Sequence, residues 1–425
     1  MFYYLYLLFE GWNIPGLGLL QYLSFRAGMA FVFALLLLMP FGAKVIRLLQ
    51  RRQIGEDIRD LGLAGQMEKK GTPTMGGILI VAATLLPTLL FANLSNAYLL
   101  IMLISTLWLG LLGGVDDYIK VFKHRKAGLK ARYKVVGQVA LGIFVALVLF
   151  LSPDTGIRPQ SVGDKGVVEQ NIVETGLEDT FSQEAAQGGG EELQLPPLDK
   201  ALTTTIPFFK NNELDYRWFV PFSGTLGDVV AWLLFALIVV MIVTSVSNGA
   251  NLTDGLDGLA AGVSVPIVAV LGLFAYLSGN VIYASYLNIA HIPNVGELLV
   301  YMGALVGALV GFLWFNGYPA KIFMGDTGSL MIGGVIGVFA VLVRKELMLP
   351  ILCGVFLIES LSVVLQVSYF KYTRMRFGEG RRIFLMSPLH HHYQKKGSPE
   401  PRIVLRFWIV SLLLAVLTIV TLKVR

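Results

Sequence analysis

The chain has 425 residues, of which 55% are hydrophobic and only 15% charged, and its formal net charge is +6. A composition this apolar excludes an ordinary soluble globule and indicates a protein that is dissolved in lipid. The single cysteine, Cys353, stands in an apolar run, which excludes an intrachain disulfide and predicts a buried, inert thiol.

Ten apolar runs are long enough to cross the bilayer, which takes about twenty helical residues for about 30 Å of hydrocarbon. Because a helix satisfies its backbone polar groups internally, the sequence predicts an all-α, polytopic membrane protein with about ten transmembrane helices. The expected spans are 22–47, 77–95, 97–115, 134–152, 225–247, 258–279, 297–315, 328–343, 347–371 and 403–423. The first twenty residues lack a basic n-region and are expected to form an interfacial or short helical segment.

One segment, 152–224, departs from this pattern, because it is polar and contains twelve acidic and five basic residues. We interpret it as a periplasmic insert. It separates an N-terminal unit, 1–151, with spans one to four, from a C-terminal unit, 225–425, with spans five to ten.

Basic residues are concentrated in the loops that follow spans one, three and nine. Loops rich in Lys and Arg stay on the cytoplasmic side, so we expect these loops in the cytoplasm and both termini in the periplasm. All the polar motifs also follow odd-numbered spans, which predicts one site at the cytoplasmic surface. They are KKGTPTMGG, GGVDDYIK, SNGANLTDGLDG, FNGYPAKIFMGDTGSL and PLHHHYQ.

Adjacent carboxylates stand at the end of span three, Asp116 and Asp117. Their mutual repulsion favours a divalent cation or a bound base where they are partly desolvated. The alternative is two solvated acids that balance Lys120 and Lys123. The glycines that precede the pair are expected to allow close helix packing.

Polar groups recur every three residues after span five, at Asn248, Asn251, Asp254 and Asp257. A helix would carry them on one face, where they could bind a sugar or base edge, or Mg²⁺ through water. The alternative is helix capping. Asp326, between two glycines before span eight, could likewise cap a helix, or hold a metal while free N–H groups meet phosphate.

Three consecutive histidines, His390, His391 and His392, precede the last span. They are not terminal, which argues against a tag, and successive side chains diverge, which argues against one shared metal. Imidazoles in a basic loop are suited to phosphate oxygens, and a plain polar loop is the alternative. Lys69, Lys70 and the threonines after them also suit phosphate, unless they are simply a basic cytoplasmic loop.

Together these groups favour phosphoryl transfer from a soluble activated donor to an acceptor carried by a lipid. A transporter would place its acids near the bilayer midplane, where we find only Glu359, in span nine. A scaffold without catalysis gives no reason for five polar motifs on one side.

In this order the motifs GGVDDYIK, NLTDGLDGL, FMGDTGSL and PLHHHYQ resemble those of the polyprenyl-phosphate N-acetylhexosamine-1-phosphate transferases. KKGTPTMGG, LWFN and the histidine loop favour the branch that uses UDP-MurNAc-pentapeptide. The resemblance implies transfer of phospho-MurNAc-pentapeptide to undecaprenyl phosphate, giving lipid I and UMP with Mg²⁺, in the bacterial inner membrane. A sibling enzyme with another UDP-N-acetylhexosamine donor is the alternative. A homodimer is compatible with this reading, and nucleic acid is not an expected partner.

The resemblance also implies roles, residue by residue, outside the insert, a connection that is usually shorter in the family. Asp326 matches the Mg²⁺ ligand and Asp116 and Asp117 the paired catalytic acids, while His390, His391 and His392 match the loop that meets the diphosphate. A phosphate monoester is largely dianionic at neutral pH, so we expect the paired acids to act in positioning and electrostatics at least as much as in proton removal. The expected substrate-binding residues are Lys69, Thr74, Lys120, Lys134, Asn251, Asp254, Gly255, Asp257, Asn316, Phe323 and Gln366.

Overall fold

The structure is a computed structural model that describes residues 1–9, 12, 14–51, 69, 71–125, 127–158, 198–208 and 213–422. Its long helices are α2 (Leu23–Arg51), α3 (Gly77–Phe91), α4 (Ala97–Phe122), α5 (Ala131–Leu151), α8 (Thr225–Thr253), α9 (Leu259–Gly279), α11 (Leu298–Asn316), α12 (Gly325–Leu342), α14 (Gly354–Phe377) and α16 (Glu400–Thr421). The short elements are α1 (Phe2–Phe9), η1 (Leu17–Gln21), β1 (Thr203–Thr205), β2 (Glu213–Asp215), η3 (Tyr216–Phe219), α10 (Val281–Leu287), η4 (Val295–Glu297), η5 (Glu346–Met348), α13 (Leu349–Leu352) and α15 (Leu389–Lys395).

The prediction of an all-α polytopic membrane protein is confirmed. Within the described residues, nine helices are long and apolar enough to cross a membrane, and α3 is a shorter apolar helix. Each of the ten expected spans coincides with one of these helices. The side of the membrane on which each loop and terminus lies stays a prediction.

Several expected spans differ from the structure at their ends: the helices matching 97–115 and 225–247, for example, continue to Phe122 and Thr253. The span expected at 77–95 ends at Phe91, because Asn96 begins the next helix by accepting a hydrogen bond from the backbone N–H of Leu99 at 3.1 Å. The span expected at 347–371 is divided at Cys353 into α13 and α14. As expected, Cys353 is a buried free thiol.

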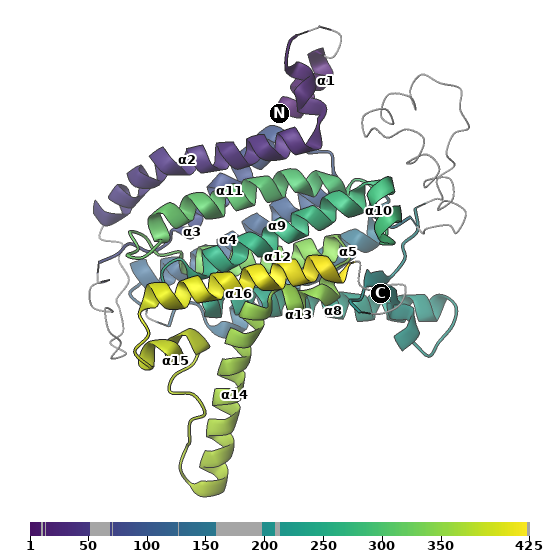
Figure 1. Ribbon diagram of the computed structural model, residues 1–425. Coiled ribbons are helices and arrows are strands. Elements are labelled where there is room, and N and C mark those ends of the chain that lie inside the picture. Colours follow the sequence, from purple (N-terminus) through teal and green to yellow (C-terminus); the bar gives the residue numbers. More distant parts are fainter. Residues whose placement is uncertain are drawn as a thin grey trace.

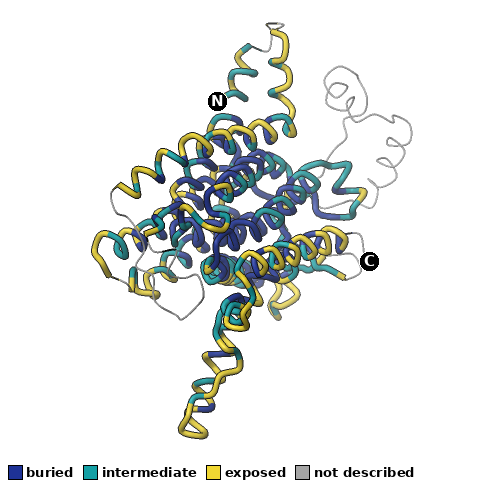
Figure 2. Tube along the Cα trace, turned by 60° about the vertical axis from the view of Figure 1, so that its left-hand side comes forward, coloured by how far each residue is buried: buried dark blue, intermediate teal, exposed yellow. Residues whose placement is uncertain are grey.

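Helix α12 lies at the centre of the bundle, and all of its residues from Asp326 to Leu342 are buried. It packs against α3, α4 and α8, while α11 packs against α2, α3 and α9 (Figure 1). Burial is concentrated among these inner helices, and exposed residues line the outer ones (Figure 2). Exposed apolar side chains on the outer helices are what a lipid-facing surface requires.

Helix α14 projects from the bundle, with α15 beside the part nearer the bundle (Figure 1). At another part of the molecule, the described C-terminal part of the insert forms the antiparallel pair β1–β2. This pair is tied to the α12–α13 connection, because the Thr205 N–H donates to the Arg344 carbonyl and the Tyr216 hydroxyl donates to Glu346. Most of the predicted insert, residues 159–197 and 209–212, lies outside the described residues.

A buried ion pair joins the start of α2 to η4. Arg26 contacts both carboxylate oxygens of Glu297, at 2.5 and 3.0 Å, and also donates to the Phe91 carbonyl at 3.2 Å. The backbone N–H of Asn93 donates to Glu297 at 2.6 Å. A bidentate pair with these extra hydrogen bonds can compensate the cost of burying two charges.

We expect Glu297→Gln to destabilise the protein by about 3–5 kcal/mol, because it leaves the Arg26 charge buried and uncompensated. Unfolding of the detergent-solubilised protein, followed by circular dichroism, measures the change. Asp228→Asn is the matched control, since Asp228 pairs with Arg217 at 3.5 Å in an exposed position and should change stability by less than about 1 kcal/mol. Equal shifts in both variants would contradict this prediction.

Candidate active site

The five polar motifs meet at one end of the bundle, as predicted. The Phe323 N–H donates to the Pro73 carbonyl at 2.8 Å, and the Lys69 amine donates to Asp257 at 2.6 Å. The remaining motifs are joined to these by contacts of Asp117 with the start of α12 and of His390 with the turn at Gly255. Residues more than three hundred positions apart in the chain therefore form one cluster.

Three buried carboxylates form the centre of this cluster: Asp116, Asp117 and Asp326 each offer an oxygen, and these oxygens lie within 4.8 Å of one another. Asp116 and Asp117 come from the last turns of α4, and Asp326 comes from the first turn of α12. The glycines Gly77, Gly113 and Gly328 bring α3, α4 and α12 close enough for this, since a Cβ at Gly113 would lie 2.2 Å from the Asp326 carbonyl oxygen.

Asp117 caps helix α12 although it belongs to α4. Its carboxylate accepts hydrogen bonds from the backbone N–H groups of Asp326 and Thr327, at 3.0 and 2.9 Å, and from the Thr327 hydroxyl at 2.6 Å. An anion here satisfies the free N–H groups of a helix N-terminus and interacts favourably with its dipole. The expected capping of this helix is thus provided by Asp117, and Asp326 is left to face the other acids.

Two lysines stand among the acids. Lys120 lies 2.7 Å from Asp116 and 3.1 Å from Asp326, and Lys134 lies 3.0 Å from Asp116 and also pairs with Asp326. Lys134 approaches Oδ1 of Asp116, and this oxygen also accepts a hydrogen bond from the Leu129 N–H at 2.6 Å. Three carboxylate oxygens within 4.8 Å of one another suit a hard divalent cation, which takes oxygen ligands. The residues present therefore fit a metal site.

Asn251 holds Asp326 from the side of α8. Its amide donates to Asp326 at 3.1 Å and to the Ser329 hydroxyl at 2.9 Å. One turn earlier, Asn248 donates to Gln138 at 3.0 Å, and Gln138 is fully buried. Helix α8 ends at Thr253, so Asn248 and Asn251 share the helix, whereas Asp254 and Asp257 lie in the turn that follows it.

A second polar group surrounds Asp257. Lys69 contacts Asp257 and Glu400, both at 2.6 Å, and the Asp257 N–H donates to Glu400 at 2.8 Å. Asn316 is buried, accepts the Gly258 N–H at 3.0 Å and donates to the Ile322 carbonyl at 2.8 Å. Asn316 therefore fixes the loops that present Asp257 and Phe323, with both ends of its amide in use.

The other predicted substrate-binding residues differ in what they can offer a ligand. Thr74 is buried and Phe323 is half-buried. The two residues are close because the Phe323 N–H donates to the carbonyl of Pro73, which precedes Thr74. Gly255 is exposed in the turn after α8, next to Asp254. Gln366 accepts the N–H groups of Ile383 and Phe384, each at 3.0 Å, so its carbonyl oxygen is used to hold the loop before α15.

The three histidines begin α15 and face different surroundings, which agrees with the expected divergence. His390 is fully buried, and its Nδ1 lies 3.1 Å from Glu359. His391 Nδ1 lies 2.7 Å from Gln394, and His392 Nδ1 accepts the Leu385 N–H at 3.1 Å.

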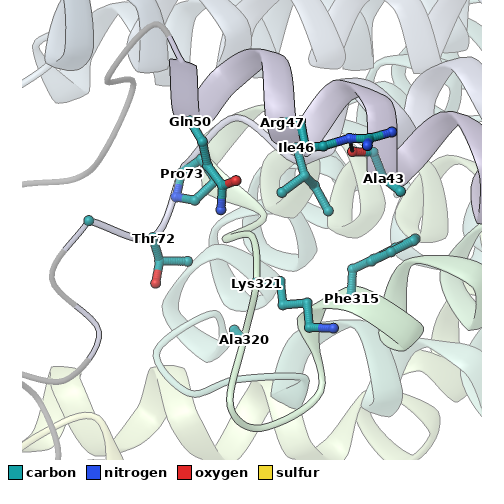
Figure 3. Close-up of a pocket in the computed structure, with 10 residues that line it drawn as sticks. Ala43, Ile46, Arg47, Gln50, Thr72, Pro73, Phe315, Ala320 and Lys321 are labelled. Carbon is teal, nitrogen blue, oxygen red and sulfur yellow. Dashed lines mark hydrogen bonds between the residues drawn. The ribbon is translucent and has the colours of Figure 1, made fainter.

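A pocket of about 640 Å³ adjoins this region at the end of α2 (Figure 3). Its lining includes Arg47, Lys321, Gln50 and Phe315, and none of the predicted site residues. It lies beside the Thr72–Pro73 segment that leads to Thr74.

Comparison with known proteins agrees with this geometry. Residues 202–344 match the model of glycosyl transferase family 4, and residues 69–81 match phospho-N-acetylmuramoyl-pentapeptide-transferase signature 1. The chain is 54% identical to the phospho-N-acetylmuramoyl-pentapeptide-transferase of Flavobacterium johnsoniae and 51% identical to that of Parabacteroides distasonis, with 100% of each chain covered. The chain belongs to the phospho-N-acetylmuramoyl-pentapeptide transferases.

The same comparisons correct one expectation about this transferase. The segment 152–224 was expected to lie outside the family resemblance. The alignment with the Flavobacterium protein runs over 426 residues and covers both chains completely, so that relative has a connection of comparable length.

Sequence reasoning assigned no site role to several residues that support this cluster. Glu400, Gln138 and Ser329 contact the predicted residues directly, but each stands in an ordinary polar or apolar context in the sequence. Among the supporting residues, Glu359 could have been found from the sequence, because it is a lone acid deep in an apolar span.

The half-buried ring of His391 makes stability depend on pH. Burial, and then the neighbouring His390, lower the pKa of His391 from 6.5 to about 4. Below pH 6.5 His391 is therefore protonated in the unfolded chain but not in the folded protein. As a result, folding stability is lost as the pH falls from about 6.5 to 4.

We expect His391→Gln to reduce this loss, measured as the change in unfolding midpoint between pH 7.5 and pH 5 in detergent. His124→Asn is the control, because His124 is exposed and adopts a positive φ of 49°, which Asn tolerates. If His391→Gln leaves the pH dependence of the unfolding midpoint unchanged, His391 is excluded as the source of that dependence.

Proposed function

We propose that the chain transfers phospho-MurNAc-pentapeptide from UDP-MurNAc-pentapeptide to undecaprenyl phosphate, giving lipid I and UMP. The observation that carries the proposal is the cluster of Asp116, Asp117 and Asp326 with two lysines, assembled from the motifs of this transferase family. The apolar bundle provides the environment for the lipid tail, and the cluster lies at the end where the water-soluble donor can enter. We further propose that this end faces the cytoplasm in the bacterial inner membrane.

In the proposed reaction an oxygen of the lipid phosphate attacks the donor phosphorus that bears the sugar. The new bond joins these two atoms, and the bond from that phosphorus to the bridging oxygen breaks, so that UMP leaves with the electron pair. The main requirement is stabilisation of negative charge on the diphosphate. Lys120 and Lys134 are close to the acids and can contribute to it once phosphate replaces carboxylate as their partner.

Asp326 would hold Mg²⁺, with Asp116 and Asp117 beside it, and the ion would supply Lewis-acid stabilisation of the phosphoryl oxygens. The hydrogen bonds of Asp117 to the first turn of α12 support a positioning role for this residue, since both of its oxygens are engaged. Asp116 is engaged as well, by Leu129 and the two lysines. These contacts favour direct attack by the lipid phosphate over a covalent aspartyl intermediate.

The donor's nucleoside is proposed to lie near the second polar group. Phe323 would stack on uracil, with Lys69, Thr74, Asn251, Asp254, Gly255, Asp257 and Asn316 around it. Gln366 would line the cleft from α14. The support for this assignment is that Phe323 and Lys69 are held on adjacent loops, by the pairing of Phe323 with Pro73 and of Lys69 with Asp257.

The proposal is tested by UMP release from the purified, detergent-solubilised protein with undecaprenyl phosphate and Mg²⁺. UMP with UDP-MurNAc-pentapeptide, and none with UDP-N-acetylglucosamine, is the expected result. UMP with the second donor alone would assign the chain to a sibling activity. Absence of UMP with both donors, from protein with an intact unfolding transition, would overturn the proposal.

A further inference from the structure

A carboxylate and an imidazole pair inside the bundle, away from the three aspartates. Glu359 in α14 and His390 in α15 are both fully buried. The Glu359 Oε2 atom lies 3.1 Å from His390 Nδ1 and 3.4 Å from the His390 backbone nitrogen. A carboxylate at this place sets the orientation of the ring, and it makes Nδ1 the nitrogen that carries a proton.

The opposite nitrogen of the ring is left without a partner. Within the described part of the chain, His390 Nε2 is buried and has no hydrogen bond. It points at the turn after α8, since a Cβ at Gly255 would lie 2.2 Å from Nε2. An unpaired buried nitrogen is unfavourable, so a structure that retains one needs a reason for it, such as a ligand.

The other two histidines are held differently. His391 Nδ1 meets an amide oxygen, and His392 Nδ1 accepts a backbone N–H, which requires an unprotonated Nδ1. Within the described residues, His390 is the one of the three whose Nδ1 meets a carboxylate. Nδ1 is the engaged nitrogen in all three rings, and the ring that meets a carboxylate there is the one whose Nε2 faces Gly255.

We propose that Glu359 is a positioning residue for His390: its carboxylate accepts the Nδ1–H bond and balances the charge of the ring when Nε2 also carries a proton, so that Nε2–H donates to a diphosphate oxygen of the nucleotide donor beside Gly255. This inference rests on the proposed function, because it concerns the same reaction. Glu359 does not touch the donor and acts through His390. The fit of Gly255 against Nε2 explains why a residue without a side chain stands at this turn.

The competing explanation is that the pair only fastens α15 to α14. The two explanations differ in how a double-mutant cycle of the rate of UMP release compares with the same cycle of the unfolding midpoint. If Glu359 acts through His390, Glu359→Met lowers kcat when His390 is present, has no further effect in a His390→Ala background, and lowers kcat more than its effect on the unfolding midpoint accounts for. If the pair is only a fastener, the losses in kcat follow the losses in the unfolding midpoint.

We expect Glu359→Met to lower kcat by about 10–100-fold with a smaller change in the donor KM, the range found when a supporting carboxylate is removed from a functional histidine. Met is close to Glu in size, so it limits the cavity. Glu379→Gln is the control, because Glu379 is exposed in the loop after α14. Glu359→Gln keeps an acceptor for Nδ1–H and should lose less than Glu359→Met.

A second readout is independent of activity. The chain contains five histidines, so the ring-nitrogen signals of protein labelled with ¹⁵N-histidine can be assigned by single substitutions. We expect Glu359→Met to change the tautomer signature of His390 and to leave that of His392 unchanged. Unchanged His390 signals, or independent losses in the double-mutant cycle, would overturn the proposal.

Failure of this inference can be told from failure of the proposed function. Wild-type protein that releases UMP, together with a Glu359→Met variant as active as wild type, would remove the role of Glu359 and leave the transferase function intact. Wild-type protein that releases no UMP with either donor would remove the proposed function, and with it the role of Glu359 toward a diphosphate.

Discussion

Replacing Asp326 by Asn should lower the rate of UMP release by at least about 10³-fold, the equivalent of several kcal/mol of lost charge stabilisation. The substitution preserves shape and the contact with Asn251 at 3.1 Å, but it removes one of three charges around the proposed Mg²⁺ site. Lys120 and Lys134 would then be left with Asp116 as their nearest acid. The rate is measured at saturating donor while Mg²⁺ is titrated, and a higher Mg²⁺ requirement should accompany the loss.

The control is Asp228→Asn, which neutralises an exposed acid outside the cluster. It separates the effect of losing the charge of Asp326 from the effect of losing any one acidic charge. This control should keep the wild-type rate and Mg²⁺ dependence. An Asp326→Asn protein with activity within about tenfold of wild type would show that Asp326 is not needed to hold the metal.

Hydropathy alone predicted the ten helical segments, because the bilayer imposes a length and a composition on every span. It could not predict the break at Cys353 or the projection of α14 from the bundle, since both depend on what each helix packs against. The grouping of the motifs was also predictable, because alternate loops of a membrane bundle lie on the same side. The sequence did not predict which loop supports which side chain.

The roles of Asp117 and Lys134 show where sequence reasoning ends. Adjacent acids indicate a shared function, yet Asp117 caps α12 while its neighbour Asp116 meets two lysines. Lys134 contacts Asp326, which is almost two hundred residues away. Such contacts arise from the packing of α4, α5 and α12, which no local pattern encodes. The site roles of these residues stay predictions until they are measured.

Gly113 provides the other large expected effect, because it determines how closely α4 approaches α12. A Cβ at this position would lie 2.2 Å from the Asp326 carbonyl oxygen and 2.6 Å from the Thr327 Cα, which are backbone atoms and cannot turn aside. Gly113 and Asp117 are four residues apart and share a face of α4. Any separation of the helices therefore also withdraws the Asp117 carboxylate from the N–H groups that it caps.

We expect Gly113→Ala to lower UMP release by about 10²-fold, the effect of displacing a reacting group by about 1 Å, and to cost about 1–3 kcal/mol through overpacking. Gly114→Ala is the matched control on the next residue, because its Cβ would meet the Thr327 hydroxyl at an ordinary 3.7 Å. In that variant the better helix propensity of Ala should hold or slightly raise stability. UMP release and the unfolding midpoint are measured for both variants. The difference between them separates the contact at the acid cluster from the general effect of replacing a glycine. Equal behaviour of the two variants would contradict the role of Gly113.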